Sequence, residues 1–248
     1  MPPSEDFTVR LPAMPGGDLD QDQEWCEVET PEGRRRIRFH DYEAIYSIPG
    51  LYETLFYETL RCNSPSVVCG LLDGAVEAEG IDRDSLVVLD LGAGNGMMGE
   101  ELAEAGAGTV VGIDILPEAA EATQRDRPTV YDDYRVVDLA EPSPEADEAL
   151  TSAPFNCLTS VAALGFGDIP PVAFERAVDA IADGGLVAFT IRDHFLGDGD
   201  ESGFSRLVEE MRRSDLLETL VEKGYVHRLS ATGEPLTYKA VVARKASP

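Results

Sequence analysis

Short apolar runs alternate with amphipathic segments over most of the chain after residue 85. The apolar runs cover residues 86–92, 109–115, 133–139, 155–164 and 186–193. The amphipathic segments between them cover residues 97–106, 116–126 and 171–185. Short continuous apolar runs between helical segments are typical of parallel strands that are covered on both faces. This pattern predicts an α/β fold with a doubly wound, mostly parallel sheet.

The last two apolar runs predict antiparallel strands instead of parallel ones. Residues 225–231 and 236–245 are separated only by Thr-Gly-Glu-Pro. Four residues are too few for a parallel crossover, so these runs are predicted to form an antiparallel hairpin. With this hairpin the predicted sheet has seven strands.

The N-terminal third predicts a separate layer. Residues 1–22 are acidic and rich in proline and glycine, lack the basic and apolar regions of a secretion signal, and are expected to be mobile. Residues 23–38 predict a hairpin around Pro31-Glu32-Gly33, with its arginines facing Glu27 and Glu29. Residues 41–60 predict helices on either side of a break at Pro49-Gly50, and Ser64 is a candidate helix cap. The predicted division is therefore a mobile segment (1–22), a hairpin with a helical lid (23–80) and a cofactor-binding domain (81–248).

The stretch VVLDLGAGNGMMGEELAEAG, residues 87–106, fits two cofactor motifs. Gly94, Gly96 and Gly99 match the G-x-G-x-x-G motif of dinucleotide sites, whereas the segment from Asp90 to Gly96 matches D-x-G-x-G-x-G, typical of S-adenosylmethionine sites. In a dinucleotide site the first glycine closely follows the strand. Counted from Gly92, the third dinucleotide position falls on Met97, so the second motif is favoured.

Three acids follow three successive predicted strands. Asp90 can reach the α-amino group of the cofactor, directly or through water, and Asp114 can accept both ribose hydroxyls, a role that an NAD enzyme would also assign to it. Asp138 is placed to meet the adenine amino group, with the Leu139 amide at the ring. An acid at the end of each of three successive strands is more specific evidence for an S-adenosylmethionine site than one glycine loop.

The segments LDLGAGNGMMGEEL, VVGIDILPEA, VYDDYRVVDL, VAALGFGDIP and DGGLVAFTIRD carry a family resemblance. Over residues 39–245 the chain resembles the class I S-adenosylmethionine-dependent methyltransferases, and among them small bacterial proteins related to the Williams-Beuren-region methyltransferase-like group. The resemblance implies an enzyme that transfers a methyl group to a small molecule, with helices forming a lid over the cofactor. It also implies cofactor contacts from the loop, the strand ends and the lid, at Ala93, Ile115, Ser160, Val161, Tyr42 and Tyr46.

The composition limits the classes of partner that the protein is expected to bind. The 248 residues include 47 acidic and 20 basic side chains, a net charge of −27 that disfavours binding to phosphate backbones. Residues 162–165, Ala-Ala-Leu-Gly, stand where nucleic-acid methyltransferases carry an [N/D]-P-P-[Y/F] loop. No apolar run approaches the roughly 18 to 20 residues of a membrane span. Four cysteines without C-x-x-C spacing are expected to be reduced, as in the cytoplasm, and no metal site is expected. The oligomeric state is not indicated.

Methyl transfer needs alignment of the reacting atoms more than it needs a base. If the acceptor is a hydroxyl or an amine, the candidate bases are His40, His194 and the lid tyrosines, and His194 is favoured because it follows the fifth strand. Two alternatives stay open: a non-catalytic module that binds S-adenosylmethionine or S-adenosylhomocysteine, and an NAD-dependent oxidoreductase.

Overall fold

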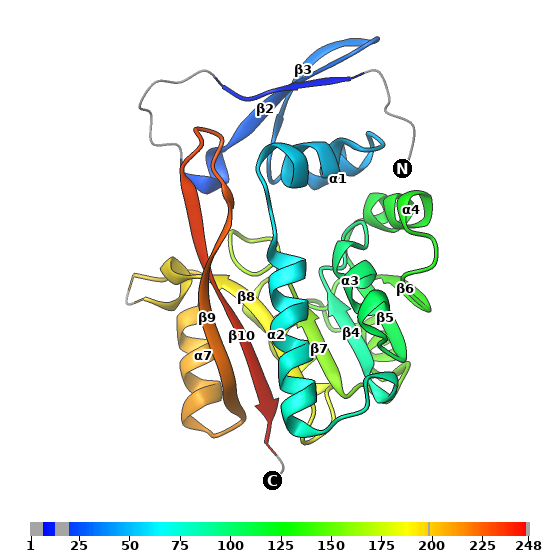
Figure 1. Ribbon diagram of the computed structural model, residues 1–248, viewed down its shortest axis with the longest axis vertical. Coiled ribbons are helices and arrows are strands. Elements are labelled where there is room, and N and C mark those ends of the chain that lie inside the picture. The colour runs from blue at the N-terminus through cyan, green and yellow to red at the C-terminus, as the bar shows by residue number, and fades with distance from the viewer. Residues whose placement is uncertain (1–6, 13–19, 198, 247–248) are drawn as a thin grey trace.

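The computed structural model describes residues 7–12, 20–197 and 199–246, and its centre is a seven-stranded sheet (Figure 1). The strand order is β6-β5-β4-β7-β8-β10-β9. The strands are β4 (Val87–Leu91), β5 (Thr109–Asp114), β6 (Asp133–Val136), β7 (Cys157–Ser160), β8 (Leu186–Arg192), β9 (Leu217–Leu229) and β10 (Pro235–Lys245). Neighbouring strands from β6 to β8 pair in parallel, and β10 is antiparallel to β8 and to β9. The predicted fold is confirmed, although β9 begins at Leu217, before the predicted run at 225.

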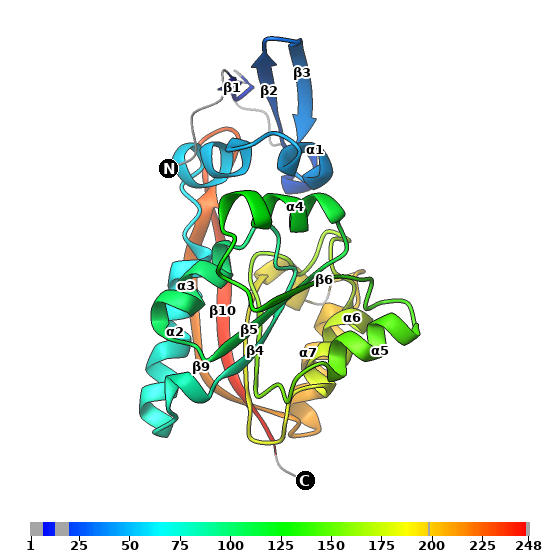
Figure 2. The ribbon, with the colours of Figure 1, turned by 90° about the vertical axis from the view of Figure 1, so that its right-hand side faces the viewer.

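Helices cover both faces of the sheet, as Figure 2 shows. On one face, α2 (Ser64–Glu79) and α3 (Met97–Ala105) pack around Val88. On the other, α5 (Pro144–Thr151), α6 (Pro171–Asp179) and α7 (Phe204–Arg213) pack around Leu89 and Leu91. Successive residues of a strand point to opposite faces, which is why one apolar run serves both cores. Helices α5 and α7 were not predicted from the sequence.

The remaining helix of the parallel part, α4 (Pro117–Asp126), lies at the carboxyl ends of β5 and β6, next to α1. The described residues also form three short 3₁₀ helices: η1 (Gln21–Gln23), η3 (Arg83–Ser85) and η4 (Asp193–Leu196). Among the helices of the described residues, none combines the length and the apolar character that a bilayer span requires.

A second unit, which we call the cap (residues 20–62), lies beyond the carboxyl ends of β4 and β5 (Figure 1). It contains β2 (Trp25–Thr30), β3 (Gly33–Arg38), the helix α1 (Tyr42–Tyr46) and the π-helix η2 (Glu53–Thr59). The predicted arginine pairing is confirmed, since Arg34 lies 3.3 Å from Glu29 and 3.6 Å from Glu27.

A third strand, β1 (Thr8–Arg10), pairs with β2 and was not indicated by the sequence pattern. It falls within residues 1–22, for which mobility was expected. Residues 1–6 and 13–19 of that segment lie outside the described residues.

The cap has its own apolar core, and the β9–β10 hairpin reaches into it. Ile45, Leu51 and Leu55 are fully buried there and belong to the same apolar cluster as Ala231 at the hairpin tip. The buried carboxylate of Glu24 accepts hydrogen bonds from Arg228 and from the Ala231 amide. The cap is therefore held to the seven-stranded sheet by β9 and β10, whose ends extend beyond the rest of the sheet into the cap.

Candidate functional site

A cavity of about 570 Å³ lies between the cap and the carboxyl ends of β4, β5 and β7. In open α/β sheets ligands bind at this edge, where the connections of neighbouring strands diverge to opposite faces. Here that point lies beside β4, the first strand of the parallel part, which has β5 on one side and β7 on the other. The lining comes from the glycine loop (91–95), from the ends of β5 and β6 (113–116, 137–140), from the loop after β7 (161–163, 167–170) and from the cap (40–43, 46, 52, 57).

The structure brings ten of the twelve sequence-predicted cofactor residues together around this cavity. They are Tyr42, Tyr46, Gly92, Ala93, Gly94, Asp114, Ile115, Asp138, Leu139 and Val161. Asp90 and Ser160 do not line it. Ser160 is fully buried at the end of β7, and within the described part of the chain its hydroxyl has no hydrogen-bond partner.

The glycines of the loop allow two other segments to approach. Gly92 and Gly94 have φ of +75° and +54°, a left-handed conformation that glycine adopts without strain. A Cβ on Gly94 would lie 2.5 Å from the Tyr46 hydroxyl, and one on Gly92 would lie 2.8 Å from Ala163. The glycine loop is therefore closely covered by the cap at Gly94 and by the loop after β7 at Gly92.

Asp114 ends β5 and faces the glycine loop. One carboxylate oxygen accepts the Gly94 amide at 2.9 Å, and the other accepts the Leu116 amide at 3.0 Å. Burial raises the pKa of this carboxyl, and the backbone N–H groups oppose that shift. A carboxylate has about four acceptor positions, so Asp114 can also accept two hydroxyl groups from a ligand in the cavity.

The next strand end provides a polar edge beside an apolar surface. Asp138 follows β6, and its carboxylate accepts the Ala140 amide at 2.7 Å. Ile115 is 53% exposed although it is large and apolar. An exposed apolar side chain beside a carboxylate and a backbone amide suits a flat ring that carries a polar edge.

Asp90 is held away from the cavity by two hydroxyl groups. Its oxygens accept hydrogen bonds from Thr159 and from Tyr131, each at 2.6 Å. Burial raises the pKa of Asp90 to about 6, and the two hydroxyls oppose that shift. In this structure Asp90 joins β4 to β7 and to the segment before β6, and its contact with a cofactor amino group stays a prediction.

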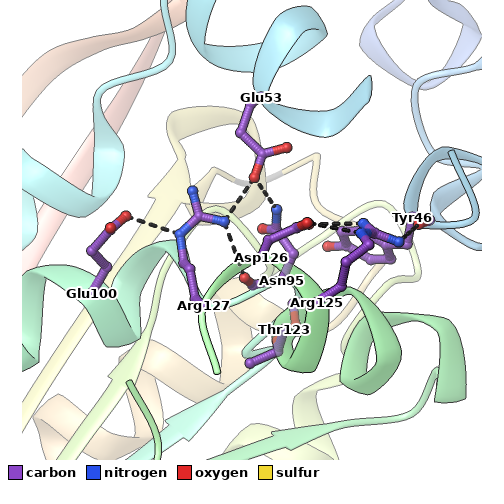
Figure 3. Close-up of polar contacts among 9 residues, drawn as sticks. Tyr46, Glu53, Asn95, Glu100, Thr123, Arg125, Asp126 and Arg127 are labelled. Carbon is purple, nitrogen blue, oxygen red and sulfur yellow. Dashed lines mark hydrogen bonds and ion pairs between the residues drawn. The ribbon is translucent and has the colours of Figure 1, made fainter. Parts of the chain in front are cut away.

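A polar network ties the cap to the glycine loop (Figure 3). Glu53 of η2 accepts hydrogen bonds from Arg127 and from the Asn95 side chain, each at 2.7 Å. Arg127 also donates to Glu100 at 2.9 Å. Beside it, Arg125 donates to the Tyr46 carbonyl at 3.2 Å. Sequence reasoning missed this network because its members come from four segments without a common local pattern.

A histidine and a carboxylate meet in the lining of the cavity, between the cap and the loop after β7. Nδ1 of His40, between β3 and α1, lies 2.9 Å from Oδ2 of Asp168 in the loop after β7, and both residues line the cavity. The Phe166 ring packs 5.1 Å from the imidazole. His194, the base favoured from the sequence, is exposed in η4 and does not line the cavity.

The lining is acidic. Five carboxylates border the cavity, from Asp41, Glu43, Asp114, Asp138 and Asp168. Among the described residues that line it there is no lysine or arginine. Such a site repels anions and favours neutral or positively charged ligands.

Solved structures with the same fold include three methyltransferases. The N-methyltransferase NodS from Bradyrhizobium japonicum WM9, in complex with S-adenosyl-L-homocysteine, is 16% identical with a TM-score of 0.56, over 84% of this chain and 98% of that one. Magnesium protoporphyrin IX methyltransferase from Synechocystis PCC 6803, with bound S-adenosylmethionine, is 15% identical with a TM-score of 0.50, over 73% and 79%. A putative RNA methyltransferase from Pyrococcus horikoshii is 16% identical with a TM-score of 0.53, over 75% and 87%.

Among curated proteins, no sequence matches the chain significantly. A family model described as a methyltransferase domain matches residues 67–223, which contain the whole parallel part of the sheet. This match covers more than half of the chain, so the protein belongs to the methyltransferase domain family and is a methyltransferase.

Proposed function

We propose that the protein transfers the methyl group of S-adenosylmethionine to a small molecule that is neutral or positively charged. The observation that carries this proposal is the position of Asp114, which accepts the Gly94 amide of the glycine loop and lines the cavity beside the cap. The subgroup resemblance, to the Williams-Beuren-region methyltransferase-like proteins, is part of the proposal and rests on the sequence segments alone.

The residues of the cavity fit this cofactor. Asp114 would accept the two ribose hydroxyls, and Ile115 would cover one face of the adenine, with Asp138 and the Leu139 amide at its edge. The acidic lining suits the positive charges of the amino group and of the sulfonium. When bound, S-adenosylmethionine supplies a methyl group on a positively charged sulfur atom.

The chain's own contribution is alignment and exclusion of water. Tyr42, Tyr46 and Tyr52 form an aromatic wall over the cavity, with ring centroids 6.0 Å apart for the first pair and 5.2 Å for the second. Holding two reactants in position inside a dry site provides a large part of the rate of a displacement reaction.

The acceptor is inferred from the size and charge of the site. A volume of about 570 Å³ lies in the range of small-ligand pockets. The absence of lysine and arginine from the described lining disfavours acceptors that carry carboxylates or phosphates. With a net charge of −27, the protein as a whole also disfavours RNA, the substrate named for the Pyrococcus neighbour.

Calorimetric titration with S-adenosylmethionine, S-adenosylhomocysteine and NAD⁺ tests the cofactor. We expect saturable binding of the first two and none of NAD⁺; binding of NAD⁺ alone would overturn the proposal. A mass-spectrometric screen with small amines, phenols and carboxylic acids then tests transfer. We expect methylated products from amines or phenols and none from the acids. Tight cofactor binding without turnover by any acceptor would identify a non-catalytic binding module.

A further inference from the structure

We propose that His40 is the general base that removes the proton from the methyl acceptor, and that Asp168 is the positioning residue that orients it. This inference rests on the proposed function and specifies its acceptor: a hydroxyl or amine group that has a proton to lose. Neither residue belongs to the cofactor set predicted from the sequence.

The hydrogen bond between the two residues leaves a defined nitrogen for chemistry. The Asp168 carboxylate can only accept, so Nδ1 of a neutral His40 carries the hydrogen and Nε2 holds the lone pair. Within the described chain, Nε2 has no hydrogen-bond partner. An imidazole fixed in this tautomer by a carboxylate is the arrangement that makes a histidine an efficient base.

The pair is placed where an acceptor would lie. The His40 side chain is 14% exposed and that of Asp168 is 25% exposed, and both line the same cavity as Asp114. The rings of Phe166 and Tyr42 lie 5.1 Å and 5.8 Å from the imidazole. These aromatic contacts limit the rotation of the base and leave an apolar surface beside it.

The loop that carries Asp168 adopts an unfavourable backbone conformation. Ala162 and Phe166 have φ of +57° and +53°, and Gly165 and Gly167 also have positive φ. A left-handed backbone is unfavourable for a residue that has a Cβ, and such residues cluster at functional sites. The conformation brings both Phe166 and Asp168 against His40, and the Asp168 amide closes the turn onto the Gly165 carbonyl at 3.1 Å.

The other candidate bases are less suitable. Burial raises the pKa of Tyr42 and of Tyr46 well above the usual tyrosine value. His227 is buried, its Nδ1 lies 2.6 Å from the Ser64 hydroxyl, and it does not line the cavity. His40 is thus the one histidine, among three in the described chain, that faces the cavity.

The proposed step is a displacement at the methyl carbon. The acceptor oxygen or nitrogen forms a bond to the methyl carbon, the carbon–sulfur bond breaks with its electron pair left on sulfur, and the acceptor proton passes to Nε2 of His40. The resulting imidazolium is stabilised by the Asp168 carboxylate and returns its proton to solvent when the product leaves.

The first test measures whether His40 lies near the transferable methyl group, without any acceptor. S-adenosylmethionine carries one positive charge more than S-adenosylhomocysteine, and that charge is at the sulfur. Imidazole NMR resonances of the protein saturated with either ligand are followed against pH, and His40 is assigned by its loss in His40→Gln. Asp168 and Tyr42 contact this imidazole and Asp41 follows it in the chain, and all three are present in both complexes.

We expect the His40 titration midpoint to lie lower with S-adenosylmethionine, because the sulfonium disfavours the imidazolium, and the exposed His194 to titrate identically in both complexes. Equal midpoints for His40 would overturn the inference while leaving the proposed function intact. Failure of both ligands to bind, seen by calorimetry, would overturn the proposed function instead.

The second test separates the base from the residue that positions it. In Asp168→Asn the side-chain amide can donate to Nδ1, so the ring hydrogen should move to Nε2, which nitrogen chemical shifts report; Asp193→Asn, beside His194, should leave the His40 tautomer unchanged. With the acceptor that the screen identifies, His40→Gln should lower kcat by about 10² to 10⁴-fold with the KM for S-adenosylmethionine unchanged. His194→Gln should have wild-type kcat. An unchanged kcat in His40→Gln would overturn the assignment.

Discussion

Two aspartates at neighbouring strand ends show how the environment separates residues that the sequence presents alike. Asp114 accepts backbone amides and faces the cavity, whereas Asp90 accepts two hydroxyl groups and is 1% exposed. The strand-end position of both acids could be predicted, because carboxyl ends of parallel strands share one edge. The partners of Asp90 could not, since Thr159 and Tyr131 lie 69 and 41 residues away in the chain.

Replacing Asp114 tests its role directly. Asp114→Asn should weaken the binding of S-adenosylhomocysteine by about 2 kcal/mol, roughly 30-fold, because a charged acceptor of two ribose hydroxyls becomes a neutral one. Calorimetric titration measures the change, and Glu121→Gln, an exposed charge loss on α4, is the matched control. Wild-type affinity in a folded Asp114→Asn protein would remove this residue from the site.

The raised pKa of Asp90 predicts a pH-dependent contribution to stability. Its pKa is about 6 in the folded protein and 3.8 for a solvated aspartate, so the folded state binds the proton more tightly and loses this advantage as the pH rises. The free energy of unfolding of the wild type, minus that of Asp90→Asn, should therefore fall by about 1 kcal/mol between pH 5 and pH 7. Urea denaturation measures it. The exposed Asp84→Asn should show no such slope, and a rising difference for Asp90→Asn would contradict the burial argument.

At the scale of elements, the cap and the glycine loop are joined by polar contacts between segments that are distant in sequence. Helix α1 and the π-helix η2 were predictable from the apolar positions around Pro49-Gly50, and Gly50 has a φ of +77°. The pairing of His40 with Asp168 and of Glu53 with Arg127 was not predictable, because each pair forms only when the cap lies on the sheet. Strand β1 was not predictable for a different reason, because its three residues are too few for a periodic pattern and gain their strand conformation by pairing with β2.

The polar contacts between the cap and the glycine loop, among them the ion pair between Glu53 and Arg127, are expected to limit the motion of the cap. We expect residues 41–60 to exchange amide hydrogens faster than β4 in the free protein, and to slow on addition of S-adenosylhomocysteine, most of all around Tyr42 and Tyr46. In Arg127→Gln, exchange in η2 should be about tenfold faster, the effect of losing roughly 1.4 kcal/mol.

Hydrogen–deuterium exchange with mass spectrometry measures these rates. Arg135→Gln removes the same charge from an exposed ion pair on β6 and should leave η2 unchanged. Equal protection of residues 41–60 with and without ligand would show that the cap does not respond to the cofactor.

At the scale of the whole molecule, the main feature is the large net negative charge. The chain carries 47 acidic and 20 basic residues, and like charges at this excess repel one another in the folded state. The apolar runs predicted the parallel sheet because its central strands β4, β5, β7 and β8 are buried on both faces. Helix α7 was not predicted, although its buried residues Phe204, Leu207, Val208 and Met211 have the i, i+3, i+4, i+7 spacing of an amphipathic helix.

Salt should stabilise the protein. Screening shortens the range of charge repulsion to about 10 Å at 0.1 M salt and about 3 Å at 1 M. The melting temperature should therefore rise as KCl increases from 0.05 M to 1 M, measured by calorimetry or circular dichroism. Glycerol at matched osmolality is the uncharged control. A melting temperature that falls with KCl would contradict the repulsion argument.

The cavity is lined by two parts of the chain, the sheet domain and the cap, and the cap has an apolar core of its own. The family model covers residues 67–223 and thus Asp114 and Asp138, whereas His40, Tyr42 and the rest of the cap lie before it. We expect this division to let evolution vary the two halves independently. Exchange of one cap for another, on an unchanged sheet, would then give related enzymes that share a methyl donor and modify different molecules.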